Sequence, residues 1–219
     1  MKKKYGRIER LDRILKAEND TPDHYQLAKQ AYVMMIFYLL PSSEVKQLMQ
    51  QLGYSFEEAD IEKNIVYYLN HTSHGSTLSK IVYASTLMDI QPQSAKELYY
   101  QALSSDVNDI QGGTTPEGIH LGVMGATAQF ASQGYSGLYV SDFNELIFKP
   151  TLPSGLKLMN WRFQYRSVWY DIELTENKLM LRLCDYGSES VTVKLNNKTY
   201  QLQGNQTLVL SLDELSLKS

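Results

Sequence analysis

The stretch Ile61-Glu62-Lys63-Asn64-Ile65-Val66-Tyr67-Tyr68-Leu69 has apolar residues three and four positions apart, which is the spacing of one face of an α-helix. The same spacing continues from about residue 25 to residue 133. Proline, glycine and loop residues divide this region into predicted helices at about 24–40, 42–52, 55–70, 76–90, 93–104 and 118–133. A succession of helices with short connections predicts a helical hairpin array or barrel.

After Gly134 the pattern changes to short runs in which apolar and polar residues alternate, as in half-buried strands. The runs that show it are 161–165, 169–174, 178–183, 191–195, 200–202 and 207–210. Asn196-Asn197 predicts a tight hairpin turn, because Asn tolerates positive φ better than most residues. The sequence therefore predicts a helical domain over residues 1–135 and an antiparallel β-sandwich over residues 136–219.

The overall charge and the cysteine content exclude several classes of function. The net charge is −3 and the pI is about 5.8, so there is no basic surplus for binding nucleic acid. The single cysteine, Cys184, has no Cys or His cluster near it, so we expect neither a disulfide scaffold nor a metal site. A reducing cytoplasm is the expected compartment.

Two segments have some features of targeting or membrane elements. Lys2-Lys3-Lys4 is followed by charged residues and not by an apolar run, so we expect no signal peptide. The apolar stretch 31–40 is about half of the roughly 20 residues that a membrane span needs, so it predicts a helix buried inside the protein. No membrane segment is expected.

The stretch His74-Gly75-Ser76-Thr77-Leu78-Ser79 lies where a predicted helix begins. In a structural interpretation, Ser76 or Thr77 caps the helix by accepting a hydrogen bond from an unpaired backbone N–H. In a functional one, Gly75 lets the backbone approach an anion, and the two hydroxyls bind its oxygens with the help of the helix dipole. The residues alone favour the helix-cap interpretation and do not exclude the phosphate-site interpretation.

A second polar cluster, Gln111-Gly112-Gly113-Thr114-Thr115, leads through Glu117 into the last predicted helix. It is typical of a turn followed by an acidic residue in the first helical turn. His120, also in that turn, is either a structural histidine or a phosphate ligand.

Three ordered motifs carry a resemblance to a known family. The first contains Lys29 and Gln30, which lie inside a predicted apolar helix and either extend to its surface or face a sugar. The motifs are Tyr25-Gln26-Leu27-Ala28-Lys29-Gln30-Ala31, then Tyr67-Tyr68-Leu69-Asn70-His71-Thr72-Ser73-His74-Gly75-Ser76-Thr77-Leu78-Ser79, then Asp106-Val107-Asn108-Asp109-Ile110-Gln111-Gly112-Gly113-Thr114-Thr115-Pro116-Glu117-Gly118-Ile119-His120-Leu121-Gly122. Together they resemble glycoside hydrolase family 65, which includes maltose, trehalose and kojibiose phosphorylases. The resemblance covers about residues 7–210.

The resemblance implies the C-terminal half of such an enzyme: mainly α plus β, with the end of an (α/α)₆ barrel followed by a jelly-roll-like β-sandwich. It implies phosphorolysis of an α-linked glucose disaccharide with inversion, with inorganic phosphate as co-substrate and no other cofactor. The implied site residues are Lys29 and Gln30 for the donor glucose, Ser76, Thr77 and His120 for phosphate, and His74, Gly75 and Glu117 in supporting positions. We expect residues from these three separated motifs to converge on one concave surface.

The chain departs from the family pattern in two places. The family's general acid is a Glu in a Gly-Pro-Asp-Glu-Tyr type motif upstream of the Lys-Gln pair. Thr21-Pro22-Asp23-His24-Tyr25 looks similar but has His24 at that position and lies immediately before the pair, so no catalytic residue is assigned in this chain. Tyr32 stands where the family usually has Asp. We expect a missing N-terminal half, or self-association, to cover helix faces that half a barrel leaves open.

Three functions are open on this basis. The leading hypothesis is the sugar- and phosphate-binding portion of an inverting α-glucoside phosphorylase, inactive until it is joined to a segment that carries the acid. The alternative is a non-catalytic carbohydrate-binding or assembly module derived from the family. Hydrolysis is a weaker third hypothesis, because the matching phosphate positions are retained.

Overall fold

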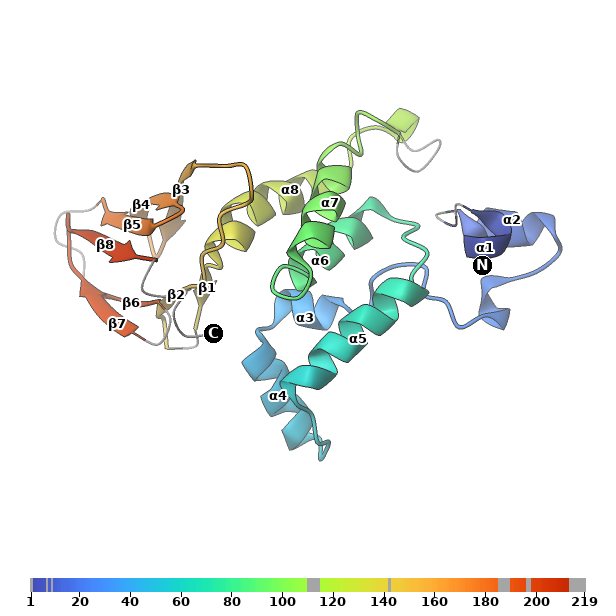
Figure 1. The fold of residues 1–219 in the computed structure, drawn as a ribbon, viewed down its shortest axis with the longest axis horizontal. Helices are drawn as coiled ribbons and strands as arrows, with labels where there is room; N and C mark the ends of the chain where they lie inside the picture. Colours follow the sequence, from blue (N-terminus) through green and yellow to red (C-terminus); the bar gives the residue numbers. More distant parts are fainter. Residues whose placement is uncertain are drawn as a thin grey trace. The chain divides into compact units, whose positions relative to one another are not determined.

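The computed structural model describes residues 2–6, 8, 10–109, 115–141, 143–184, 190–195 and 198–212. The chain divides into two compact units, Met1–Ala128 and Gln129–Ser219. Helices form the first unit and strands most of the second (Figure 1). The fold is therefore a mixed one, with a helical part followed by a sheet-rich part.

The elements follow one another in the order expected from the two periodicities. The helical elements are α1 (Lys2–Tyr5), α2 (Leu11–Ala17), the 3₁₀ turn η1 (Pro22–His24), α3 (Met35–Leu39), α4 (Ser42–Gln51), α5 (Glu58–His71), α6 (Thr77–Thr86), α7 (Pro92–Leu103), the 3₁₀ turn η2 (Thr115–Glu117), α8 (Leu121–Gln129) and the π-helical turn η3 (Phe130–Gly134). The strands are β1 (Tyr139–Val140), β2 (Leu146–Phe148), β3 (Leu158–Tyr165), β4 (Val168–Thr175), β5 (Lys178–Leu183), β6 (Val191–Leu195), β7 (Lys198–Leu202) and β8 (Thr207–Ser211). None of the described helices is long and apolar enough to cross a membrane.

The predicted helices that correspond to α4, α5, α6 and α7 are present, with ends within about one turn of the prediction. Their starts have local causes. Glu57 and Asp60 form a capping box at the start of α5. Pro92 occupies the first turn of α7, where its missing N–H costs nothing.

The predicted helix at 24–40 is wrong in its first two-thirds. Only Met35–Leu39 is helical there, preceded by the short turn at Pro22–His24. The backbone at Ala28 instead forms an isolated parallel bridge with Thr72. Lys29 and Gln30 therefore lie in an irregular segment and not inside a helix, because a distant backbone segment takes the hydrogen bonds that a helix would have used.

The predicted burial of the stretch 31–40 is confirmed only in part. Half-buried residues pack against the apolar core of this unit at Met35, Ile36, Phe37, Tyr38 and Leu40. Ala31 and Met34 are buried, but the side chains of Tyr32 and Leu39 are 64% and 65% exposed. Within the described residues of α3, none is buried. This stretch therefore presents apolar surface to solvent.

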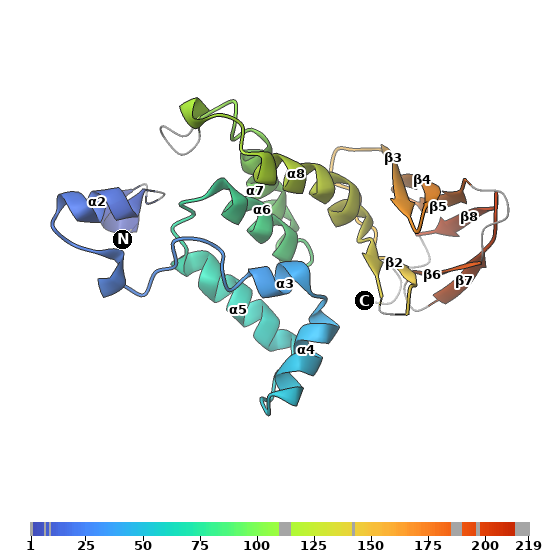
Figure 2. The same ribbon diagram turned by 180° about the vertical axis from the view of Figure 1, so that it is seen from behind.

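One apolar core joins α3 to α7. Met34, Tyr83 and Leu87 are fully buried in it. The Tyr83 hydroxyl and the Thr72 hydroxyl lie 2.8 Å apart, and burial raises the pKa of Tyr83 to about 12. Helix α6 packs beside α7 in this unit (Figures 1 and 2). This packing positions α6.

The strands form two sheets over one shared core. In the described part of the chain, the sheet orders are β1-β2-β6-β7 and β3-β4-β5-β8. Phe148 from the first sheet and Tyr170 and Leu181 from the second are buried in the same cluster. The two sheets face one another in Figures 1 and 2, which is the layered arrangement that the alternating pattern predicts.

The expectation that all strands would pair antiparallel is wrong at one place. β2 pairs with β6 in parallel, with Leu146 opposite Val193 and Phe148 opposite Leu195. The other described pairings are antiparallel. A three-residue strand such as β2 is too short to carry a directional sequence signal, so this pairing could not be predicted. The predicted turn at Asn196-Asn197 lies outside the described residues.

Candidate functional site

The site begins where two segments far apart in sequence pair through their backbones. The N–H of Ala28 donates to the carbonyl of His71 at 2.7 Å, and the N–H of Ser73 donates to the carbonyl of Ala28 at 2.9 Å. The Lys29 carbonyl accepts from the N–H of Gly75 at 3.1 Å and from the Ser73 hydroxyl at 3.1 Å. These bonds bring Lys29 against the loop that leads into α6.

Ser76 is the N-cap of α6. Its backbone is extended, with φ of −132° and ψ of 139°, and its hydroxyl accepts from the N–H of Leu78 at 3.3 Å. Thr77 is the first helical residue and is 3% exposed. The structural interpretation of this motif, a helix cap, is therefore confirmed for Ser76. A capping hydroxyl still leaves other N–H groups of the first turn pointing out of the helix start.

His74 holds an unusual backbone conformation directly before this cap. Its φ is 55°, in the left-handed region that non-glycine residues rarely adopt. Its ring packs edge-on against the buried ring of Tyr83, with centroids 5.1 Å apart. The loop into α6 is therefore fixed in orientation by the core beneath it.

His120 lies directly before α8 and not in its first turn as predicted, because α8 begins at Leu121. The Asp106 carboxylate explains why the helix starts one residue after His120. It accepts from the His120 backbone N–H at 2.9 Å and lies 2.7 Å from the ring Nδ1. Because an ionised carboxylate only accepts hydrogen bonds, Nδ1 carries the proton, and Nε2 is the ring atom left to meet a ligand.

The contacts among the described residues do not bring all the predicted site residues together. Lys29 meets the 73–75 loop, but no hydrogen bond or ion pair in the described part of the chain links His120 to Ser76 or Thr77. Glu117 ends η2, and its side chain lies outside the described part, as does the predicted turn at 111–114. The convergence of all three motifs stays a prediction.

The Lys29 side chain faces a separate cavity of about 520 Å³. Asp12, Tyr25 and Tyr32 also line it. The Lys29 ammonium lies 3.6 Å from the Asp12 carboxylate, but both side chains are well exposed, so water screens this pair. Gln30, the next residue, is half-buried and is not among the described residues that line this cavity. An ammonium, a carboxylate and phenol rings around one cavity are groups that can bind sugar hydroxyls.

The stretch that resembles an acid motif is occupied by local contacts. Thr21 caps η1 by accepting from the N–H of Asp23, and the His24 ring lies 2.7 Å from the Asp20 carboxylate. This segment is a capped turn. The described residues also contain no group of three or more His, Cys, Asp or Glu that could hold a metal ion.

Asp106 was missed as a site residue because nothing in the local sequence pairs it with His120. The hydrogen bond from the His120 ring, followed by that from its backbone N–H, lowers the pKa of the Asp106 carboxyl below its ordinary value of 3.8. A carboxyl group whose pKa is lower in the folded protein than in the unfolded chain stabilises the fold at pH values above the unfolded-state pKa. That stabilisation is lost as the pH falls through the folded-state pKa.

We therefore expect Asp106→Asn to lower the melting temperature at neutral pH, with a loss that shrinks as the pH falls below about 4. Melting curves between neutral and strongly acidic pH would measure this. Asp89→Asn, at an exposed position on the same unit, is the matched control and should show no such trend. A deficit for Asp106→Asn that stays constant down to the lowest pH would show that the carboxylate charge is not involved.

Comparisons with known proteins agree on one family. The model of the glycosyl hydrolase family 65 central catalytic domain matches residues 1–129, and that of the family 65 C-terminal domain matches residues 141–202. An uncharacterized glycosyl hydrolase of Mycobacterium tuberculosis is 38% identical over 205 residues, which cover 94% of this chain and 15% of that protein. Trehalose 6-phosphate phosphorylase of Lactococcus lactis is 37% identical over 179 residues, covering 81% of this chain and 23% of that protein.

More distant relatives point the same way. Kojibiose phosphorylase of Caldanaerobacter subterraneus is 26% identical over 81% of this chain and 21% of its own length. A solved structure described as a candidate kojibiose phosphorylase from the human microbiome superposes with a TM-score of 0.67 and 19% identity, over 85% of this chain and 25% of that one. The fold is therefore shared with that structure, and the chain spans about a quarter or less of the length of these relatives.

Proposed function

Because the chain belongs to glycosyl hydrolase family 65, we propose that it is the C-terminal portion of an inverting α-glucoside phosphorylase. In this proposal Lys29 and Gln30 bind the donor glucose, Ser76, Thr77 and His120 bind phosphate, and the general acid lies in another segment. The observation that carries it is the backbone pairing of Lys29 with Ser73 and Gly75, directly before the start of α6. That pairing supports a common site for the sugar and phosphate positions.

The chemistry follows from the geometry of inversion. An inverting displacement needs an acid on the leaving oxygen and a nucleophile on the opposite face of the sugar. In a phosphorylase the phosphate is that nucleophile, so the protein must bind and orient an anion. The outward N–H groups at the start of α6 are suitable donors, and the Nε2 atom of His120 can also donate when the ring is protonated on both nitrogens. Inorganic phosphate is then the co-substrate, and no other cofactor is needed.

The substrate class in this proposal is an α-linked glucose disaccharide. The names of the relatives include trehalose 6-phosphate, trehalose and kojibiose. The relative named for trehalose 6-phosphate shares 37% identity, against 26% or less for those named for trehalose and kojibiose. Trehalose 6-phosphate is therefore the first disaccharide to test.

The remaining expectations belong to the same proposal. The helical unit would be part of an (α/α)₆ barrel over residues 1–135, and the strands a jelly-roll-like sandwich over residues 136–219. The exposed side chains of Tyr32, Val33 and Leu39 support a partner surface, filled by the N-terminal half of the enzyme or by self-association. A cytoplasmic location fits the single cysteine.

The alternative is a non-catalytic carbohydrate-binding or assembly module. The presence of Tyr32 in the cavity beside Lys29 favours it, because a phenol stands where the family usually has a carboxylate. Sugar binding without turnover, even after the missing half is supplied, would select this alternative.

Phosphate binding is the direct test of the proposed site. We expect millimolar affinity, so that at ten times Kd the stabilisation is about 1.4 kcal/mol, or roughly 3–6 °C in melting temperature. Phosphate should stabilise more than chloride at matched ionic strength, and the difference should shrink in the double variant Ser76→Ala, Thr77→Ala. Equal stabilisation of both proteins would mean that the anions act by exclusion from the surface and that the motif is only a helix cap.

A further inference from the structure

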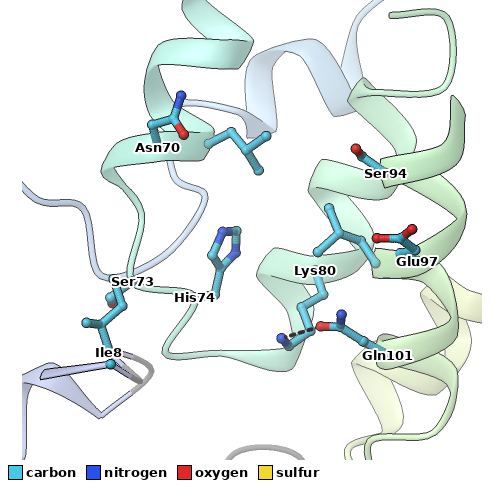
Figure 3. Close-up of a pocket in the computed structure, with 11 residues that line it drawn as sticks. Ile8, Asn70, Ser73, His74, Lys80, Ser94, Glu97 and Gln101 are labelled. Carbon is cyan, nitrogen blue, oxygen red and sulfur yellow. Dashed lines mark hydrogen bonds between the residues drawn. The ribbon is translucent and has the colours of Figure 1, made fainter. Parts of the chain in front are cut away.

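A cleft of about 420 Å³ lies in the helical unit, on the side of α6 that faces α7. This volume is within the range of roughly 300–1,000 Å³ that is typical of ligand sites. Ser76, Thr77 and His120 are not among the described residues that line it. Figure 3 shows the His74 ring in the middle of the cleft, with the Glu97 carboxylate facing it from α7.

The base of the cleft contains a buried cation. Lys80 is 6% exposed, which is rare for a lysine. Its ammonium donates to the side-chain carbonyl of Gln101 at 2.8 Å, so α6 and α7 are joined by a polar contact at the cleft wall. Glu97 lies one turn before Gln101 on α7 and is exposed at the opening. The positive charge of Lys80 and the negative charge of Glu97 therefore leave the cleft with no net charge from these two residues.

The other described residues of the lining include no further Lys, Arg, Asp or Glu. Asn70 contributes an amide from the end of α5, and Ser94 contributes a hydroxyl from α7. Leu69 and Leu98 supply a small apolar wall. Donors and acceptors beside an apolar strip match the surface of a sugar ring, whose hydroxyls both donate and accept and whose C–H groups form an apolar face.

The backbone of His74 also constrains the cleft. Its left-handed φ of 55° costs energy in a non-glycine residue, and such strain gathers at functional positions. The edge-on contact with Tyr83 holds the ring in the cleft. The imidazole is therefore presented to the cleft in one orientation.

We propose that this cleft binds a small uncharged polyol of monosaccharide size, with D-glucose as the probe. The balanced charges disfavour an anion, and the mixture of amide, hydroxyl, carboxylate and ammonium groups favours a ligand with many hydroxyls. Glu97 accepts from sugar hydroxyls at the opening, and Asn70 and Gln101 bind them deeper in. The site is additional to the donor-glucose position at Lys29, although Ser73 lines both cavities. It does not depend on the proposed phosphorylase function.

The histidines provide separate reporters for the test. The chain has four, His24, His71, His74 and His120, so ¹³C-histidine labelling gives ring signals that single substitutions can assign. D-Glucose titrated to high millimolar concentration should shift the His74 signal. Glu97→Gln should weaken the binding by about tenfold, since it removes a charged acceptor. Ser94→Phe should abolish the shift by filling the cleft.

Two control variants make each outcome decisive. Glu62→Gln, the same change at an exposed position of α5, should bind as wild type. Lys29→Ala should leave the His74 shift intact; its loss would mean that the signal reports the donor-glucose position and would overturn the proposal. An unchanged His74 signal, or equal shifts in wild type, Glu97→Gln and Ser94→Phe, would overturn it too.

Inorganic phosphate separates this proposal from the phosphorylase site. It should shift the His120 signal, and it should shift the His74 signal less than D-glucose does. A larger effect of phosphate than of glucose on His74 would identify an anion site and sink the polyol assignment. A missing shift at His120 would count against the phosphate site alone, so the two proposals fail separately.

Discussion

The chain by itself should release no glucose 1-phosphate above background from phosphate and trehalose 6-phosphate, trehalose, kojibiose or maltose. Without a positioned acid the leaving oxygen departs as a poor alkoxide, and general acid catalysis is typically worth about 10²–10⁴-fold. Loss of half the donor pocket would add to the deficit. The measurement is a coupled assay of glucose 1-phosphate against protein concentration.

Lys29→Ala, purified in the same way, is the control for contaminating host enzymes. Product that rises with protein concentration and disappears in Lys29→Ala would contradict the prediction, because it would show a working acid within this chain. Product that is the same in both proteins would come from a contaminant. Restoration of activity by a polypeptide that carries the Gly-Pro-Asp-Glu-Tyr type motif would support the split-enzyme proposal.

The second large effect is expected at Gly137, in the passage that leads from η3 into β1. Its φ is 58°, and a Cβ there would lie 2.3 Å from the backbone carbonyl oxygen of Lys149. Gly137→Ala therefore combines left-handed strain with a clash against backbone that cannot rotate away. We expect a loss of about 2–5 kcal/mol in the free energy of unfolding.

Gly155→Ala separates the two causes. Gly155 has φ of +91°, but a Cβ there meets nothing within 4 Å. Its substitution should cost only the backbone strain, about 1–2 kcal/mol. Denaturant unfolding of both variants would measure the difference. Equal losses would show that the approach of Lys149 to Gly137 is not a tight one in solution.

The sequence predicted the elements whose signals are local. Helices α4 to α7 have three-four periodicity with Gly or Pro at their boundaries, and β3 to β8 have alternation over at least three residues. The family assignment was also accessible from the sequence and is confirmed by the family models. It depended on ordered polar motifs that periodicity does not explain.

Two of the misses have one physical cause, which is pairing between distant segments. The helix predicted through Lys29 failed because Ala28 and Lys29 bond to the 71–75 backbone. The start of α8 was misplaced because Asp106 holds the His120 N–H. In each case a partner far away in sequence satisfied a backbone group, and no local pattern reports such a partner. The site roles of Ser76, Thr77 and His120 stay predictions.

The parallel pairing of β2 with β6 has a consequence for the order of folding. β3, β4 and β5 are joined by short connections, and Arg166 and Ser167 have the positive φ values of a tight two-residue turn. Hairpins of this kind form within about 1–10 μs. The β2–β6 contact instead closes a loop that contains the whole meander, so its entropic cost must be met before its bonds form. We therefore expect the β3-β4-β5 meander to form first and to act as the template on which the second sheet closes, and variants at Leu146 or Val193 to speed unfolding more than they slow folding.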